Sequence, residues 1–105
     1  MQKFEYRYPR IYVDCAVIFT TQENTITGRC TNISTVGAGA SLSQPVPIGT
    51  TGLLTIESLT CALEVHARVT HSGLSGTGLA FTFSCNDERA ALEQFLEKLP
   101  KLHRL

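Results

Sequence analysis

Two long segments of the chain alternate apolar and polar residues with a period of two, and this pattern restricts the fold more than any other feature. Residues 11–20 (IYVDCAVIFT) and residues 61–71 (CALEVHARVTH) both place apolar side chains at alternate positions. Such a period sets one face of a β-strand against a hydrophobic core and the other face toward solvent. The pattern therefore predicts two long, half-buried strands.

Four further strands are expected, separated by turn residues. Residues 21–24 (TQEN) are expected to close a hairpin, and the prolines and glycines of SQPVPIGTTG exclude that segment from a central ladder. The further strands are residues 25–33, 40–42 and 53–58, and a last strand with Leu79, Phe81 and Phe83 on its inner face. Six strands joined in this way are typical of an antiparallel barrel or sandwich, so the predicted fold class is mainly all-β.

The C-terminal part of the chain changes to a helical pattern. Residues 86–99 (NDERAALEQFLEKL) carry an apolar stripe at helical spacing, formed by Leu92, Phe95, Leu96 and Leu99. Asn86 is a candidate N-cap, and Pro100 is expected to end the helix. We expect this amphipathic helix to lay its apolar face on one open end or face of the sheet structure.

Length and charge limit the classes of function. The chain has 105 residues, which predicts a single domain spanning residues 1–105. Nine basic side chains balance nine acidic ones, so no bulk field draws the protein to a nucleic acid polymer or to an anionic membrane. Any anion site must therefore be local.

Neither a leader nor a membrane span is expected. The first ten residues (MQKFEYRYPR) hold no apolar run of signal-peptide length, and no segment approaches the ~20 apolar residues of a membrane helix. We therefore expect a cytoplasmic protein, in which Asn32, although part of an N-glycosylation pattern, is not a sugar acceptor. The four cysteines form no C-x-x-C pair and are expected to be reduced core or near-core residues.

No catalytic or metal-binding group is recognisable in the sequence. The segment GAGASL lacks the third glycine and the following helix of a dinucleotide loop. His66 and His71 lie five residues apart on one predicted strand, so they should point to opposite faces and cannot share a metal. No Ser-His-Asp or Cys-His grouping stands out. We therefore predict no catalytic residues, no metal site and no enzymatic activity.

Two short motifs remain, and each has a plain structural interpretation. YRYPRI, from Tyr6 to Ile11, could be a charged terminal arm, and NISTVG, from Asn32 to Gly37, could be a turn whose glycine supplies a positive φ. Together, however, they resemble the PilZ domain family. That family has an R-x-x-x-R motif before its first strand and a [D/N]-x-S-x-x-G motif after its second. Arg10 and NISTVG occupy these places, and the closing GTGLAFTF followed by ERAALEQFLEKL extends the resemblance over the whole chain.

The resemblance implies a six-stranded antiparallel β-barrel (residues 11–84) with an N-terminal arm (1–10) and a C-terminal α-helix (86–99). It also implies a receptor for cyclic di-GMP that passes the signal to a protein partner, with no cofactor. In that family role, an arginine fork can bind a phosphate or the O6/N7 edge of guanine. An amide and a hydroxyl can bind a guanine edge, and a glycine lets a flat base approach the backbone. The implied ligand-binding residues are Arg7, Arg10, Asn32, Ser34 and Gly37.

One position departs from the family pattern. The first arginine of R-x-x-x-R should lie at residue 6, where this chain has Tyr6, and Arg7 lies one place late. In an extended arm, a shift of one residue turns a side chain to the opposite side. The alternative hypothesis is therefore a nucleotide-independent interaction module of the same fold, such as an adaptor for pilus or motility machinery. An unrelated small barrel that binds oligonucleotides is disfavoured by the neutral charge and the lack of an aromatic strand platform.

Overall fold

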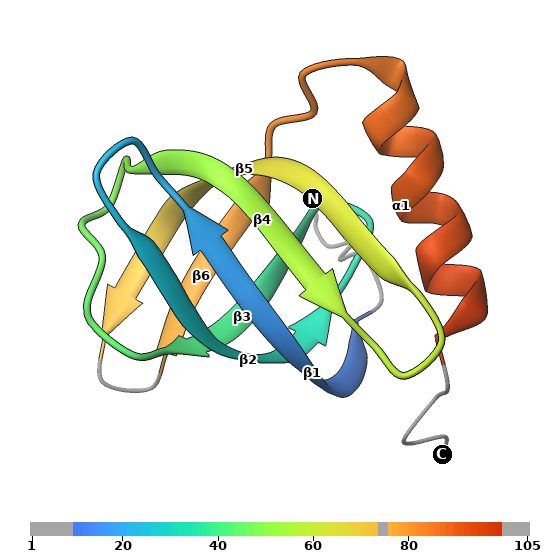
Figure 1. The fold of residues 1–105 in the computed structure, drawn as a ribbon, viewed down its shortest axis with the longest axis horizontal. Helices are drawn as coiled ribbons and strands as arrows, with labels where there is room; N and C mark the ends of the chain where they lie inside the picture. Colours follow the sequence, from blue (N-terminus) through green and yellow to red (C-terminus); the bar gives the residue numbers. More distant parts are fainter. Residues whose placement is uncertain (1–9, 74–75, 100–105) are drawn as a thin grey trace, which may run out of the picture.

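The six strands close into a barrel. The computed structural model describes residues 10–73 and 76–99. Each strand is antiparallel to both neighbours, in the spatial order β1-β2-β3-β6-β5-β4 (Figure 1). The closed order decides between the predicted barrel and sandwich in favour of the barrel. The strands are β1 (Ile11–Thr20), β2 (Thr25–Ile33), β3 (Gly37–Leu42), β4 (Thr51–Glu57), β5 (Ala62–Gly73) and β6 (Gly76–Phe81).

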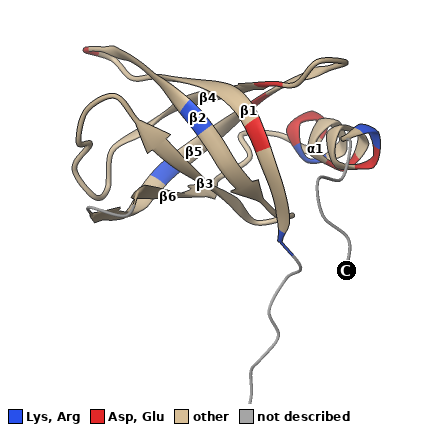
Figure 2. Ribbon diagram, turned by 90° about the horizontal axis from the view of Figure 1, so that it is seen from below, with Lys and Arg blue, Asp and Glu red and all other residues tan. Residues whose placement is uncertain are grey.

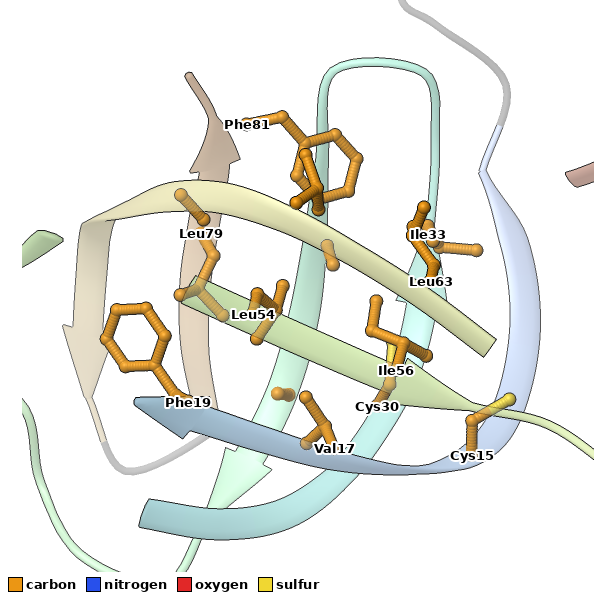
Figure 3. Close-up of a cluster of buried hydrophobic side chains, with 14 of the residues drawn as sticks. Cys15, Val17, Phe19, Cys30, Ile33, Leu54, Ile56, Leu63, Leu79 and Phe81 are labelled. Atoms are coloured by element: carbon orange, nitrogen blue, oxygen red, sulfur yellow. The ribbon is translucent and has the colours of Figure 1, made fainter. Parts of the chain in front are cut away.

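The alternating side chains of the strands fill the barrel interior. The inward positions of β1 and β5 predicted from the period of two are buried, which confirms that interpretation. Phe19, Leu54 and Ile56 are fully buried at the centre of this core, where β1 pairs with β4 (Figure 3). Because such side chains interdigitate at high density, removing one of them is expected to cost several kcal/mol of stability.

Two strand boundaries differ from the prediction. β3 begins at Gly37 rather than Ala40, since Gly37 already pairs with Ala80 of β6. The last strand ends at Phe81, so its predicted extension to Phe83 was wrong, although the half-buried Phe83 does pack against the core. Phe83 adopts a positive φ of 42°, and the guanidinium carbon of Arg89 lies 4.3 Å from the centre of its ring. Phe83 thus packs against the core, with its ring centre 5.8 Å from that of Phe81, and also makes a cation–π contact with Arg89.

The helix α1 (Asn86–Lys98) packs beside β5 (Figure 1). Leu92, Phe95 and Leu99 are buried against the barrel, as the helical spacing predicted. The prediction of Asn86 as N-cap was wrong, because the cap residue is Cys85 and it makes no side-chain cap hydrogen bond. In the described part of the chain, no helix is long and apolar enough to cross a membrane.

A carboxylate fastens the start of α1 to the barrel. Glu88 accepts hydrogen bonds from the backbone amides of Ser84 (3.0 Å) and His66 (3.1 Å), and its Oε2 lies 2.6 Å from His66 Nδ1. Partial burial alone would raise the pKa of Glu88, but these hydrogen bonds outweigh burial and lower it to about 2. The contact with Ser84 resembles the return arm of a capping box, and it satisfies backbone donors that precede the helix.

The cysteines are all free thiols. Cys15 and Cys30 are buried and Cys61 is half-buried, which agrees with the predicted core or near-core positions. Cys85 is exposed, so the prediction was wrong for this residue, which lies beyond the last strand at the start of α1.

Candidate ligand-binding site

A single row of paired residues crosses five strands on the outer surface of the barrel. Tyr12 of β1 pairs with Asn32 of β2, and Asn32 pairs in turn with Gly39 of β3. Gly39 lies opposite Gly78 of β6, which pairs with His71 of β5. Residues paired directly across strands project to the same face of a sheet. The row therefore has two glycines at its centre and larger polar or aromatic side chains on both sides.

The glycines form the floor of an open trough with a volume of about 330 Å³. A Cβ atom on Gly39 would lie 2.6 Å from Asn32 Nδ2, and one on Gly78 would lie 3.2 Å from His71 Cβ. The Asn32 amide thus lies close to Gly39 at one wall, whereas the His71 ring at the other wall lies along β5 toward Gly73, where a Cβ would be 3.3 Å from His71 Nε2. The trough is lined by the five residues of the row together with Arg10, Thr31, Ala38, Ala40, Ser41, Gly76 and Thr77.

Three irregularities of strand register lie beside this row. They fall between Tyr12 and Cys15, between Cys30 and Asn32, and between Val69 and His71. An extra residue in one strand bends it and re-aims the side chains that follow. The bulges therefore influence the directions of the side chains that border the trough.

The bulge in β5 also corrects one prediction. His66 and His71 were expected on opposite faces, but both are exposed on the outer surface, because the extra residue between Val69 and His71 shifts the alternation. His66 contacts Glu88 and His71 lines the trough, so the two histidines still do not share a site. Within residues 10–73 and 76–99, no group of three or more potential metal-ligating side chains occurs.

Arg10 and Asn32 meet at one wall of the trough. Arg10 Nη1 donates a hydrogen bond of 2.5 Å to Asn32 Oδ1, and Asn32 Nδ2 donates to Thr31 Oγ1 at 3.2 Å. Thr31 Oγ1 donates in turn to the carbonyl of Gly39 at 3.3 Å, so the network connects the guanidinium to the floor. Charged donors make the stronger hydrogen bonds, and this one fixes the amide orientation of Asn32.

The backbone of Asn32 is held from inside the barrel. The thiol of Cys30 donates to the carbonyl of Asn32 at 3.3 Å. Burial raises the pKa of Cys30 to about 12, so this thiol stays protonated and keeps its role as donor. Asn32 is therefore positioned from both its side chain and its backbone.

The trough favours an anionic, ring-containing ligand. Arg10 is the one cation among its lining residues in the described chain, and no aspartate or glutamate lies there. The described strands carry few charged positions, whereas α1 carries charges of both signs (Figure 2). The glycine floor offers a flat surface, and Tyr12, with 61% of its surface exposed, offers an aromatic ring for stacking.

Ser34 and Gly37 lie in the turn that supports this wall and do not line the trough. Ser34 is only 1% exposed, its amide donates to the Gly37 carbonyl at 2.8 Å, and its Oγ accepts from the Val36 amide at 3.2 Å. A positive φ was expected at Gly37, but among the described glycines only Gly49 and Gly76 have one. A Cβ on Gly37 would lie 2.3 Å from the carbonyl oxygen of Leu79. Glycine is therefore needed here because β3 and β6 approach closely.

The structure thus brings together two of the five residues named from the sequence. Arg10 and Asn32 are in direct contact at the trough, and Arg7 lies outside the described residues. Sequence reasoning missed the glycine pair Gly39 and Gly78, together with Tyr12 and His71. The available signal was the repetition of G-x-G in GAG and GTG, which places glycines at alternate positions of two strands.

Comparisons with known proteins agree with this architecture. The family model described as PilZ domain matches residues 6–98. The PilZ domain of CeSA from a cellulose-synthesizing bacterium has a similar fold, with a TM-score of 0.72 and 16% identity, over 85% of this chain and 95% of that chain. The Bacillus subtilis inhibitor of motility (MotI/DgrA) matches with a TM-score of 0.64 and 20% identity, over 93% of this chain but only 55% of its own. The comparison with curated protein sequences gave no match.

Proposed function

Because this chain belongs to the PilZ domain family, we propose that it binds cyclic di-GMP in the trough and passes the signal to a protein partner. PilZ domains are non-catalytic receptor domains of that second messenger. The observation that carries the proposal is the contact between the Arg10 guanidinium and the Asn32 amide at the wall of a glycine-floored trough.

The chemistry of the ligand matches the groups at this wall. Cyclic di-GMP presents two phosphates and two guanines, and Arg10 can bind a phosphate or the O6/N7 edge of guanine with two parallel hydrogen bonds. Asn32 has both an acceptor and a donor for a guanine edge. Because Gly39 has no side chain of its own, the Asn32 amide lies close above its backbone, where it can bind the edge of a guanine that enters the trough.

The other residues named from the sequence take supporting parts in this proposal. Ser34 and Gly37 shape the turn after β2 and so set the position of Asn32. Arg7 would approach the ligand from the segment that precedes Arg10. Closure of that segment over the ligand would change the surface offered to the protein partner, which is a common way to transmit binding.

Thermal unfolding with and without cyclic di-GMP tests the proposal directly. At a ligand concentration near 100 times Kd, binding only to the folded state adds about 2.7 kcal/mol of stability. For a domain of this size, that gain raises the melting point by roughly 10–20 °C. The control ligand is GTP, which carries guanine and phosphate but not the cyclic dinucleotide. No shift with cyclic di-GMP at millimolar concentration would eliminate the receptor function.

The second candidate function is a nucleotide-independent interaction module. Tyr6, in place of the first arginine of R-x-x-x-R, favours it, since tyrosine cannot neutralise a phosphate. Under this alternative, cyclic di-GMP leaves the melting point unchanged in the wild-type chain. A protein partner would then bind equally well with and without the nucleotide, which a pull-down with a candidate partner can measure.

A further inference from the structure

The trough has a local two-fold symmetry. Gly39 and Gly78 lie opposite each other on antiparallel strands, so a two-fold axis passes between them, perpendicular to the sheet. Rotation about this axis exchanges β3 with β6, and therefore β2 with β5, because these outer strands pair antiparallel with β3 and β6. The row of paired residues then superimposes Asn32 on His71.

The backbone irregularities obey the same symmetry. β2 has an extra residue between Cys30 and Asn32, and β5 has one between Val69 and His71. The extra residue is a threonine in both strands. Thr31 Oγ1 donates to the Gly39 carbonyl at 3.3 Å, and Thr70 Oγ1 donates to the Gly78 carbonyl at 3.4 Å.

His71 therefore occupies on β5 the position that Asn32 occupies on β2, although its ring lies toward Gly73 while the Asn32 amide lies over Gly39. Its imidazole can donate or accept a hydrogen bond, or stack on a ring. Among the described residues, none makes a hydrogen bond to the ring of His71, whereas the ring of His66 on the same strand lies 2.6 Å from Glu88. Three strand spacings separate β2 from β5, or about 14 Å, a span that one guanine does not fill.

We propose that the trough is a two-fold seat for a two-fold ligand, in which His71 contacts one half of cyclic di-GMP as Asn32 contacts the other. This inference rests on the proposed function, because cyclic di-GMP consists of two identical halves. Arg10 breaks the two-fold symmetry, because it contacts Asn32 and no second lysine or arginine among the described residues lines the trough beside His71. The Asn32 half therefore binds more strongly, and His71 adds the second, weaker contact.

Amide NMR of the whole chain, titrated with cyclic di-GMP, tests the seat without any substitution. The expected result is a shift of the amide signals of both Gly39 and Gly78, while Gly52, on β4, does not move. A shift of Gly39 without Gly78 overturns the two-fold seat and leaves the receptor function standing. No shift of any signal overturns both.

Substitution of His71 tests the contact itself. His71→Ala is expected to weaken cyclic di-GMP binding about 3–10-fold in calorimetry, the loss of one neutral hydrogen bond, and His71→Gln should recover part of it. The matched control is Arg68→Ala, on the same strand and exposed but outside the trough, which should leave binding unchanged.

The ligand-free melting point separates a ligand contact from a structural role. Because His71 is exposed, His71→Ala should leave that melting point unchanged. Unchanged affinity, or a loss of affinity that follows a lowered melting point, contradicts the proposal. An equal loss of affinity in Arg68→Ala would also contradict it, because the effect would then be one of general surface change.

Discussion

His66 and His71 share a residue type, a strand and an exposed face, yet they lie in regions with different roles. His66 lies under the start of α1, where Glu88 contacts both its ring and its backbone amide. His71 lies at the edge of the trough, beside Gly78. The first histidine belongs to a contact that holds the helix on the barrel, and the second is exposed and lines the trough.

The strand β5 thus carries one histidine that helps to hold the helix on the barrel and another that lines the proposed binding site. Side chains at the start of α1 make hydrogen bonds with one another and with β5, so substitutions there should alter stability and leave ligand binding intact. Side chains of the trough wall are solvent-exposed or half-buried, so changes there should alter binding and leave stability intact.

Arg10→Ala should have the largest effect on binding. Loss of the Arg10 guanidinium, the one cation among the described residues of the trough, should weaken cyclic di-GMP binding about 10–100-fold in calorimetry. The ligand-free melting point should stay nearly unchanged, because Arg10 is exposed. Arg29→Ala, an exposed arginine of β2 that pairs with Asp14, is the control for general charge. An equal loss of affinity in both variants would contradict a specific role for Arg10.

Ser34→Ala should show that a residue of the family motif acts through the fold. The substitution leaves the Val36 amide without its acceptor in a partly buried turn and should cost about 1 kcal/mol of stability. Chemical denaturation measures this loss, and Ser43→Ala, an exposed serine, should be neutral. If Ser34→Ala retains full stability but loses cyclic di-GMP binding, the hydroxyl contacts the ligand directly, as the motif resemblance first suggested.

Tyr6→Arg tests whether the first position of R-x-x-x-R limits the affinity for cyclic di-GMP. It completes R-x-x-x-R with Arg10 and should tighten cyclic di-GMP binding about tenfold, which corresponds to about 1.4 kcal/mol. Tyr6→Lys, which restores the charge without the bidentate fork, is the matched control and should gain less. Unchanged affinity in Tyr6→Arg would show that the register of the arm does not limit binding.

Glu88→Gln should have the smallest effect, and only on stability. The pKa of Glu88 is lowered from 4.5 to about 2, so its carboxylate stabilises the fold above pH 4.5 and loses this contribution as the pH falls toward 2. Glutamine keeps an acceptor, so the loss at neutral pH should be about 1 kcal/mol.

Melting points at pH 5 and pH 3 measure this dependence on Glu88. The decline between the two values should be smaller in Glu88→Gln than in the wild type, whereas Glu93→Gln, on the exposed face of α1, should keep the wild-type decline. Weaker cyclic di-GMP binding by Glu88→Gln at neutral pH would contradict the separation of the two regions.

Much of the fold was predictable because it depends on local patterns. The period of two in β1 and β5 and the helical spacing of Leu92 and Phe95 report burial directly, and the structure confirms both. Boundaries failed where tertiary pairing overrides local signals. Gly37 joins β3 because β6 lies beside it, and β6 ends at Phe81, before Phe83, whose ring contacts both the core and Arg89.

The site was less predictable because it depends on register across strands far apart in sequence. Arg10 and Asn32 follow from motifs, but no local pattern brings Gly39 and Gly78 opposite each other. The position of His71 depended on a bulge, since strict alternation assigns it to the wrong face. Bulges leave no clear mark in a single sequence, and they decided which side chains border the trough.

The glycine floor of the trough cannot by itself select one nucleotide over another. Gly39 and Gly78 contribute no side chain of their own, so they give the trough no contact that distinguishes one flat ring from another. Selection among nucleotides must then come from the wall residues Arg10, Asn32 and His71. Substitution of these wall residues should therefore change the preferred base or phosphate pattern. The two glycines, in contrast, must be kept for any ring to enter the trough.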